Sequence, residues 1–183
     1  MLSRFLRSPI ALFFVASATV FGQKDPETRK RDLEQMLSAV VPFAEQMLKK
    51  HGEFYPYGAT MNGEGKISSV AGYTGSEHPQ STEVIGMLKA AFRRDAEAGK
   101  IRACALVYDI RTVPPGKTQK MDAVAVDLDH RDGMSIVVVY PYVIAPDKTV
   151  TMSQSFAVKG KNEIFQAKSD GPDSAPKTPP PRP

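Results

Sequence analysis

The sequence predicts an α+β domain: an antiparallel sheet of about five to seven strands with two main helices, in the order α-β-β-α-β-β-β-β. Apolar residues recur at helical spacing in two segments, around residues 26–51 and 81–98. The other apolar runs are rich in Val, Ile and Tyr, and the connections between them are too short for the crossover helices of a parallel sheet. A chain of 183 residues with 42% hydrophobic and 24% charged residues fits one modest globular domain.

The first helix is predicted to begin at Asp25-Pro26-Glu27, where a capping side chain precedes a proline and an acid. Its apolar stripe consists of Leu33, Met36, Leu37, Val40, Ala44, Met47 and Leu48. Gly52 can end the helix in the left-handed conformation. Because Pro42 removes one hydrogen bond, we expect a kink or a break near Val41.

A hairpin is predicted next, with strands at residues 53–61 and 66–73 around the turn Asn62-Gly63-Glu64-Gly65. The second helix is expected from Ser81 to Ala98, with Ser81 as its N-terminal cap and Gly99 as its stop.

Four strand runs follow, at residues 101–113, 121–130, 134–144 and 150–158, and Ile164-Phe165 is a candidate short edge strand. The segment Ser135 to Tyr140 is continuously apolar after its first residue, which predicts a central strand covered on both faces. We expect both helices on one face of the sheet. Loops, part of the kinked helix or a partner would then cover the other face.

Two terminal segments are set apart from the domain, which we place at residues 23–168. Residues 1–22 contain two arginines followed by a charge-free stretch of 13 residues, which is typical of a secretory signal peptide and too short to span a bilayer. Cleavage after Ala18 or after Gly22 fits, and we prefer Gly22 because a polar stretch follows it. An uncleaved anchor or a buried helix is the alternative. We therefore expect a secreted or periplasmic protein with no stable membrane span after signal removal.

The other end, residues 169–183, holds six of the 15 prolines and no large apolar residue, which predicts a disordered or polyproline II tail. The formal net charge of +4 falls to +2 when the signal is removed, since it carries two arginines and no acid. Basic clusters such as Arg29-Lys30-Arg31 lie on predicted helices among acidic residues, so we expect no nucleic-acid partner.

Few residues of the sequence suggest catalysis or a cofactor. One Cys and three His are too few for a disulfide scaffold or a zinc module with several Cys and His ligands. No Gly-x-Ser-x-Gly nucleophile elbow and no phosphate-binding glycine loop after a strand is present. We therefore assign no catalytic residue and expect no cofactor.

The best metal candidate is the segment Asp127-Leu128-Asp129-His130 at the end of a predicted strand. Asp127 and Asp129 should project from one face of that strand, so two carboxylates and the imidazole of His130 could converge on a cation. A half-exposed strand that runs into a turn has the same pattern, and we favour that reading.

Aromatic residues are the other functional clue. Tyr55 and Tyr57 should share one face of the first strand, and Tyr140 and Tyr142 one face of a later strand. If their unburied sides meet, they form an aromatic sheet surface suited to binding another protein. The alternative, which we favour, is that the rings complete the core of a domain without Trp.

Two resemblances extend these expectations. The order of helices and strands is similar to that of roadblock, longin and other profilin-like folds, although extra terminal strands are present and no final helix is evident. Residues 52–58, Gly-Glu-Phe-Tyr-Pro-Tyr-Gly, resemble the first strand of a group of uncharacterised bacterial domains, in which a strand ending like Tyr140-Pro141-Tyr142 also recurs. This resemblance extends loosely over residues 33–166 and implies no catalytic residue.

The sequence thus favours an exported bacterial protein that is a non-enzymatic binding or interaction domain. A small secreted metal-assisted hydrolase with Asp127, Asp129 and His130 at its site is the first alternative. A toxin-neutralising immunity protein is the second.

Overall fold

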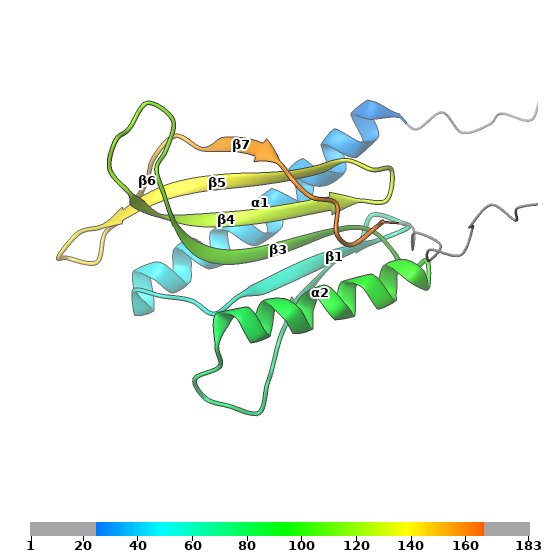
Figure 1. Cartoon of the computed structure of the whole chain (residues 1–183), viewed down its shortest axis with the longest axis horizontal. Helices are drawn as coiled ribbons and strands as arrows, with labels where there is room; N and C mark the ends of the chain where they lie inside the picture. The colour runs from blue at the N-terminus through cyan, green and yellow to red at the C-terminus, as the bar shows by residue number, and fades with distance from the viewer. Residues whose placement is uncertain (1–24, 167–183) are drawn as a thin grey trace, which may run out of the picture.

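Seven strands form one antiparallel sheet that is flanked by two helices (Figure 1), which confirms the predicted α+β class and the order of the elements. The computed structural model describes residues 25–166, so the predicted signal peptide (1–22) and tail (169–183) lie outside the described residues. The strand order is β2-β1-β3-β4-β5-β6, and β7 also pairs with β5. The elements are α1 (Pro26–His51), β1 (Tyr57–Asn62), β2 (Ile67–Ala71), α2 (Ser81–Glu97), β3 (Ile101–Thr112), β4 (Met121–His130), β5 (Ser135–Ile144), β6 (Val150–Met152) and β7 (Phe156–Lys159). No helix within residues 25–166 combines the length and hydrophobicity that a membrane crossing requires.

The two helices lie on opposite faces of the sheet, so the expectation that both cover one face is wrong. On β3, Ala103 and Ala105 belong to the core under α1, whereas Cys104 and Leu106 belong to the core under α2. Consecutive residues of a strand point to opposite faces, so the uninterrupted apolar run of β3 supplies both cores. The central strands covered on both faces are therefore β3 and β4.

The prediction of a central strand at residues 135–140 is only partly right. β5 is paired on both sides, but its outer neighbours are the short strands β6 and β7 at the edge. Of these six residues, only Val138 and Val139 are buried.

α1 begins and ends where the sequence predicts. The Asp25 side chain accepts a hydrogen bond from the backbone N–H of Glu27 (3.1 Å), and Gly52 adopts a φ of 79° at the other end. A kink or a break was expected near Val41, and the helix continues through Pro42 without a break. Pro42 lies on the exposed side, where water can reach the Ser38 carbonyl that loses its partner, while the buried stripe holds both halves on the sheet.

α2 packs closely on β1 because Gly58 has no side chain. A Cβ at this position would collide with the Ala105 carbonyl oxygen and would lie 2.7 Å from the Phe92 ring. The residue before the helix is Gln80, whose side chain makes no capping bond, so the expected cap at Ser81 is wrong by one residue. Gly99, with a φ of 67°, follows the end of the helix as predicted.

The predicted fourth run, residues 150–158, is divided into β6 and β7. From the pair Tyr142–Met152 to the pair Val139–Phe156, the chain that connects β6 to β7 contains one residue more than the facing part of β5. This extra residue forms a bulge. Pro141 accounts for it: its carbonyl accepts a hydrogen bond from the Ser153 N–H (2.7 Å), but it has no N–H to donate on that side.

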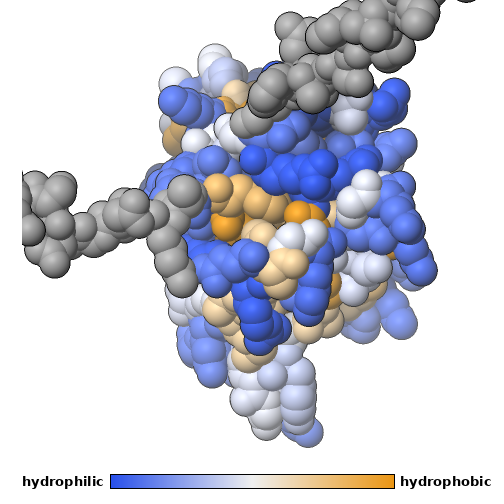
Figure 2. Space-filling model, turned by 90° about the vertical axis from the view of Figure 1, so that its right-hand side faces the viewer, coloured by the Kyte–Doolittle hydropathy of each residue, from blue (hydrophilic) through white to orange (hydrophobic). Residues whose placement is uncertain are grey.

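Residues 160–166, which we call the closing segment, follow β7 and pack against α2 (Figure 1). Lys89 on α2 and Glu163 form an ion pair of 2.6 Å, and Ile164 is buried in the same core as Phe92. The predicted edge strand at Ile164-Phe165 is therefore wrong, since these residues form a bend that packs on a core. Figure 2 shows the end of the molecule near this segment, where hydrophilic side chains border a small apolar area.

Candidate functional site

The three predicted metal ligands do not converge. Asp127 and Asp129 share one face of β4, as expected, and line a small cavity beside α2. His130 lies on the opposite face and contacts Asp32 of α1. Within residues 25–166, no group of three or more His, Cys, Asp or Glu side chains is arranged to hold a metal ion.

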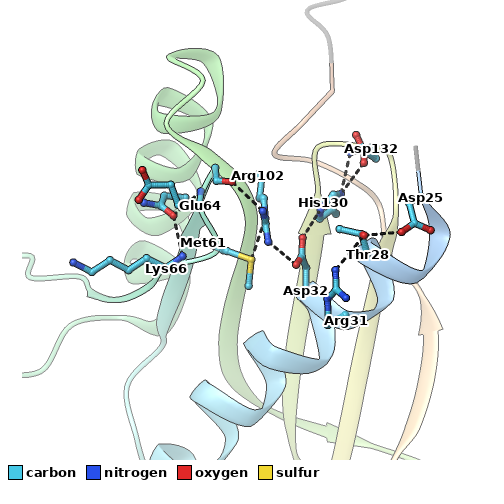
Figure 3. Close-up of polar contacts among 12 residues, drawn as sticks. Asp25, Thr28, Arg31, Asp32, Met61, Glu64, Lys66, Arg102, His130 and Asp132 are labelled. Atoms are coloured by element: carbon cyan, nitrogen blue, oxygen red, sulfur yellow. Dashed lines mark hydrogen bonds and ion pairs between the residues drawn. The ribbon is translucent and has the colours of Figure 1, made fainter. Parts of the chain in front are cut away.

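His130 instead belongs to a buried polar network that joins α1 to the sheet (Figure 3). Asp32 accepts a hydrogen bond from Arg102 Nη2 through Oδ1 (2.7 Å), and its Oδ2 lies 3.3 Å from His130 Nε2. Asp32 is 1% exposed and His130 is 2% exposed. Because a buried carboxylate needs a partner, the Arg102 guanidinium is what makes this acid tolerable in the interior.

The hydrogen bonds around His130 define its chemistry. The backbone N–H of Asp132 donates to Nδ1 (3.1 Å), so the ring proton is assigned to Nε2, which donates to Asp32. Burial lowers the pKa of His130, and the hydrogen bond to Asp32 opposes this effect only in part. The ring is thus neutral at pH 7 with both nitrogens engaged, and it has no lone pair free for a substrate. The network stabilises the fold and is not a general base.

Sequence reasoning missed Asp32 and Arg102, although one signal was visible. Asp32 precedes Leu33 and lies one helical turn before Met36, so it sits within the apolar stripe of α1. An acid at such a position predicts a buried partner. The sequence could not identify that partner, because Arg102 and His130 lie 70 and 98 residues away from Asp32 along the chain.

Asp127 and Asp129 have unsatisfied oxygens on the other face of β4. Oδ1 of each is buried without a hydrogen-bond partner, while Asp129 Oδ2 accepts from the Ile164 N–H (3.0 Å). The cavity that they line holds about 10 Å³, which is close to the space needed for one water molecule. Burial and then the neighbouring Asp129 charge raise the pKa of Asp127 to about 6, and Lys89 opposes this rise.

The four tyrosines of the predicted binding surface are not exposed together. Tyr57 and Tyr142 are 8% and 6% exposed in the core under α1, and Tyr140 packs against the same core. The Tyr57 hydroxyl donates to the Val40 carbonyl (2.7 Å), and the Tyr142 hydroxyl to Asp109 (3.1 Å). These hydroxyl partners let the rings be buried without loss of hydrogen bonds.

Tyr55 is the exception among them, with 46% of its surface exposed. Its hydroxyl lies 3.1 Å from His78 Nδ1 in the loop before α2. Tyr73, at the start of that loop, is 80% exposed.

A hollow lined by described residues lies at the opposite end of the sheet from the Asp32 network. Residues 114–119, in the loop between β3 and β4, and residues 153–156, around the bulge, form its walls, and Met121 and Pro141 also line it. We call it the loop cleft. Its volume of about 680 Å³ lies within the usual range of ligand pockets. The sequence pattern predicted only a short connection between the strands at residues 101–113 and 121–130, so the cleft was not predicted.

Comparisons with known proteins give no further guide, since no protein-family model, no curated protein and no solved structure matches the chain. The function therefore has to be argued from the hollows and charges of the described residues.

Proposed function

We propose that this protein is an exported, non-enzymatic binding domain that holds its ligand in the loop cleft. The observation that carries the proposal is the size of the cleft, about 680 Å³, which is the size of an ordinary ligand pocket. Export is inferred from residues 1–22 of the sequence alone.

The lining of the loop cleft argues for binding rather than for chemistry. It consists mainly of hydroxyls, amides, prolines and the half-buried Phe156, and Lys117 is its one charged residue. No His, Asp, Glu or Cys is among these described lining residues, so the cleft supplies no general base and no thiolate. Neutral polar groups beside prolines and an aromatic ring suit a ligand with both backbone amides and apolar side chains. A segment of another protein has this chemistry.

Peptide selection tests the site. A random peptide library displayed on phage is selected against the protein, and each enriched peptide is titrated into ¹⁵N-labelled protein. We expect the largest amide shifts at residues 116–121 and 153–156. Binding should fall more than about tenfold in Gln154→Trp, whose indole would fill the cleft.

A matched control is Gln35→Trp on the exposed side of α1, which makes the same substitution far from the cleft. Peptides that bind both variants equally, or whose shifts lie elsewhere, would contradict the proposal. Export is tested separately by N-terminal sequencing of material secreted from a bacterial host. An intact Met1 on that material would contradict signal cleavage.

A further inference from the structure

The edge of the sheet beside the loop cleft has unused backbone groups. β7 pairs with β5 from Val139–Phe156 to Ile136–Lys159, and no described strand pairs with its outer side. Alternate residues of an antiparallel strand direct their N–H and C=O away from the paired neighbour. The outer side of β7 therefore offers donors and acceptors to one more strand.

The segments next to this edge carry mainly positive charge. Residues 113–120 come before β4, and residues 145–162 contain β6, β7 and the turns beside them. Together they hold five lysines and one acid: Lys117, Lys120, Lys148, Lys159, Lys161 and Asp147. All five lysines are exposed, and none forms an ion pair within the described part of the chain. The Asp147 carboxylate is engaged by the Thr149 N–H (2.9 Å) of its own turn. We call β7 and these five lysines the lysine edge.

The two faces of β7 differ. Phe156 and Val158 pair with Val139 and Val137, so they point to the α2 side, where Phe156 lines the loop cleft and Val158 is 49% exposed. Lys159 points to the other side. A strand added here would meet apolar groups with one set of alternate residues and positive charge with the other.

We propose that the lysine edge is the docking surface for an extended segment of a partner protein in which acidic and apolar residues alternate, added as a further strand beside β7. This inference rests on the proposed function and names the partner's chemistry. Main-chain hydrogen bonds to β7 would provide the affinity, and the acidic residues would select this segment over others.

Two other occupants fit the same edge less well. A second copy of this chain would bring the same five lysines into contact with themselves, and charged residues of this kind oppose edge-to-edge pairing of like chains. Single-stranded nucleic acid is bound by a positively charged groove together with several aromatic rings, or arginine planes, on which its bases stack. The two segments contain no Arg, and Phe156 is their one aromatic residue.

Designed peptides test the inference directly. Acetylated and amidated (Glu-Val)₄, (Gln-Val)₄ and (Lys-Val)₄ are titrated into ¹⁵N-labelled protein at 50 mM salt. We expect (Glu-Val)₄ to shift the amides of residues 116–119 and 153–161. Its affinity should exceed that of (Gln-Val)₄ by about fivefold or more and should weaken with added salt, and (Lys-Val)₄ should not bind.

Protein and peptide variants identify the contacts. Lys159→Glu with Lys161→Glu should weaken (Glu-Val)₄ binding by about tenfold. The matched control, Lys50→Glu with Lys66→Glu, makes the same change in net charge at two exposed lysines elsewhere and should alter affinity by less than about twofold. A (Glu-Val)₄ peptide with alternate backbone amides N-methylated should lose binding, because it cannot pair with a strand.

The outcomes separate the two proposals. Equal binding of (Glu-Val)₄ and (Gln-Val)₄ at the cleft would overturn the inference that the partner segment is acidic. It would leave the proposal of a binding domain intact. Failure of (Glu-Val)₄ to bind, or shifts elsewhere, would overturn this docking surface, whereas the phage selection decides the binding function by itself. Tighter binding of octathymidylate than of (Glu-Val)₄ would overturn the peptide partner and indicate that the lysine edge binds nucleic acid.

Discussion

Replacing Asp127 by Asn should remove a pH dependence of stability that the buried carboxyl creates. The pKa of Asp127 rises from 3.8 to about 6 on folding, first because of burial and then because of the Asp129 charge. The folded protein therefore holds a proton that the unfolded chain releases between these pH values. This stabilising contribution is complete below pH 3.8 and is lost as the pH rises through 6.

The size of the effect follows from these two pKa values. Proton linkage gives a loss of about 1.4 kcal/mol in the free energy of unfolding between pH 5 and pH 7.5. A discount for solvent screening at a side chain that is not fully buried leaves about 1 kcal/mol. Asn carries no charge, so Asp127→Asn should gain about 1 kcal/mol on wild type over this pH range, or about 3 °C in Tm.

Urea unfolding at pH 5 and pH 7.5 measures this difference, and the comparison between variants cancels the titrating groups that do not interact with Asp127. Asp122→Asn is the control on the same strand, where the exposed carboxylate pairs with Arg111 (3.0 Å). Its effect should stay within about 0.5 kcal/mol of zero at both pH values. A constant difference between Asp127→Asn and wild type would refute the assignment of the proton to this site.

Three further predictions concern the packing of the core and the buried network. Asp32→Asn should cost about 3 kcal/mol of unfolding free energy, because it leaves the partly buried Arg102 guanidinium without its anion. Glu34→Gln on the exposed side of α1 should cost under about 0.5 kcal/mol, and similar losses in the two variants would argue against the network. Gly58→Ala should destabilise the fold by about 2 kcal/mol or more in thermal unfolding, and Gly63→Ala, which meets open space, should not. In ¹⁵N NMR spectra, His130 should keep its proton on Nε2 and titrate below its ordinary pKa of 6.5. The stability that its neutral form provides is then lost as the pH falls. Titration above 6.5 would contradict its burial.

Local features of the chain were predicted well because their causes lie within a few residues. The Asp25 cap, the Gly52 stop and the hairpin around Asn62 each depend on the conformation of one short stretch. The α2 cap was misplaced by one residue because both Gln80 and Ser81 can precede a helix, and no side-chain bond marks the start.

Features that depend on which face a residue occupies were not predicted. An apolar run such as 103–107 is compatible with helices on either face, so the sequence alone could not place α1 and α2 on opposite sides. Distant partners are equally hidden: nothing near Tyr57 or Tyr142 shows that their hydroxyls reach Val40 and Asp109. The split of residues 150–158 could have been foreseen, because Pro141 removes a donor from the strand opposite.

The position of α1 has a consequence for the order in which the chain can fold. Asp32 is synthesised early, but its partners Arg102 and His130 follow 70 and 98 residues later. Until β3 and β4 exist, the apolar stripe of α1 can pack only on the β1–β2 hairpin, and contacts of such sequence separation form slowly. A chain that ends near residue 100 should therefore stay unfolded. On the proposed export route, this delay would keep the emerging polypeptide unfolded, and so able to pass through an export channel, until almost the whole domain has been made.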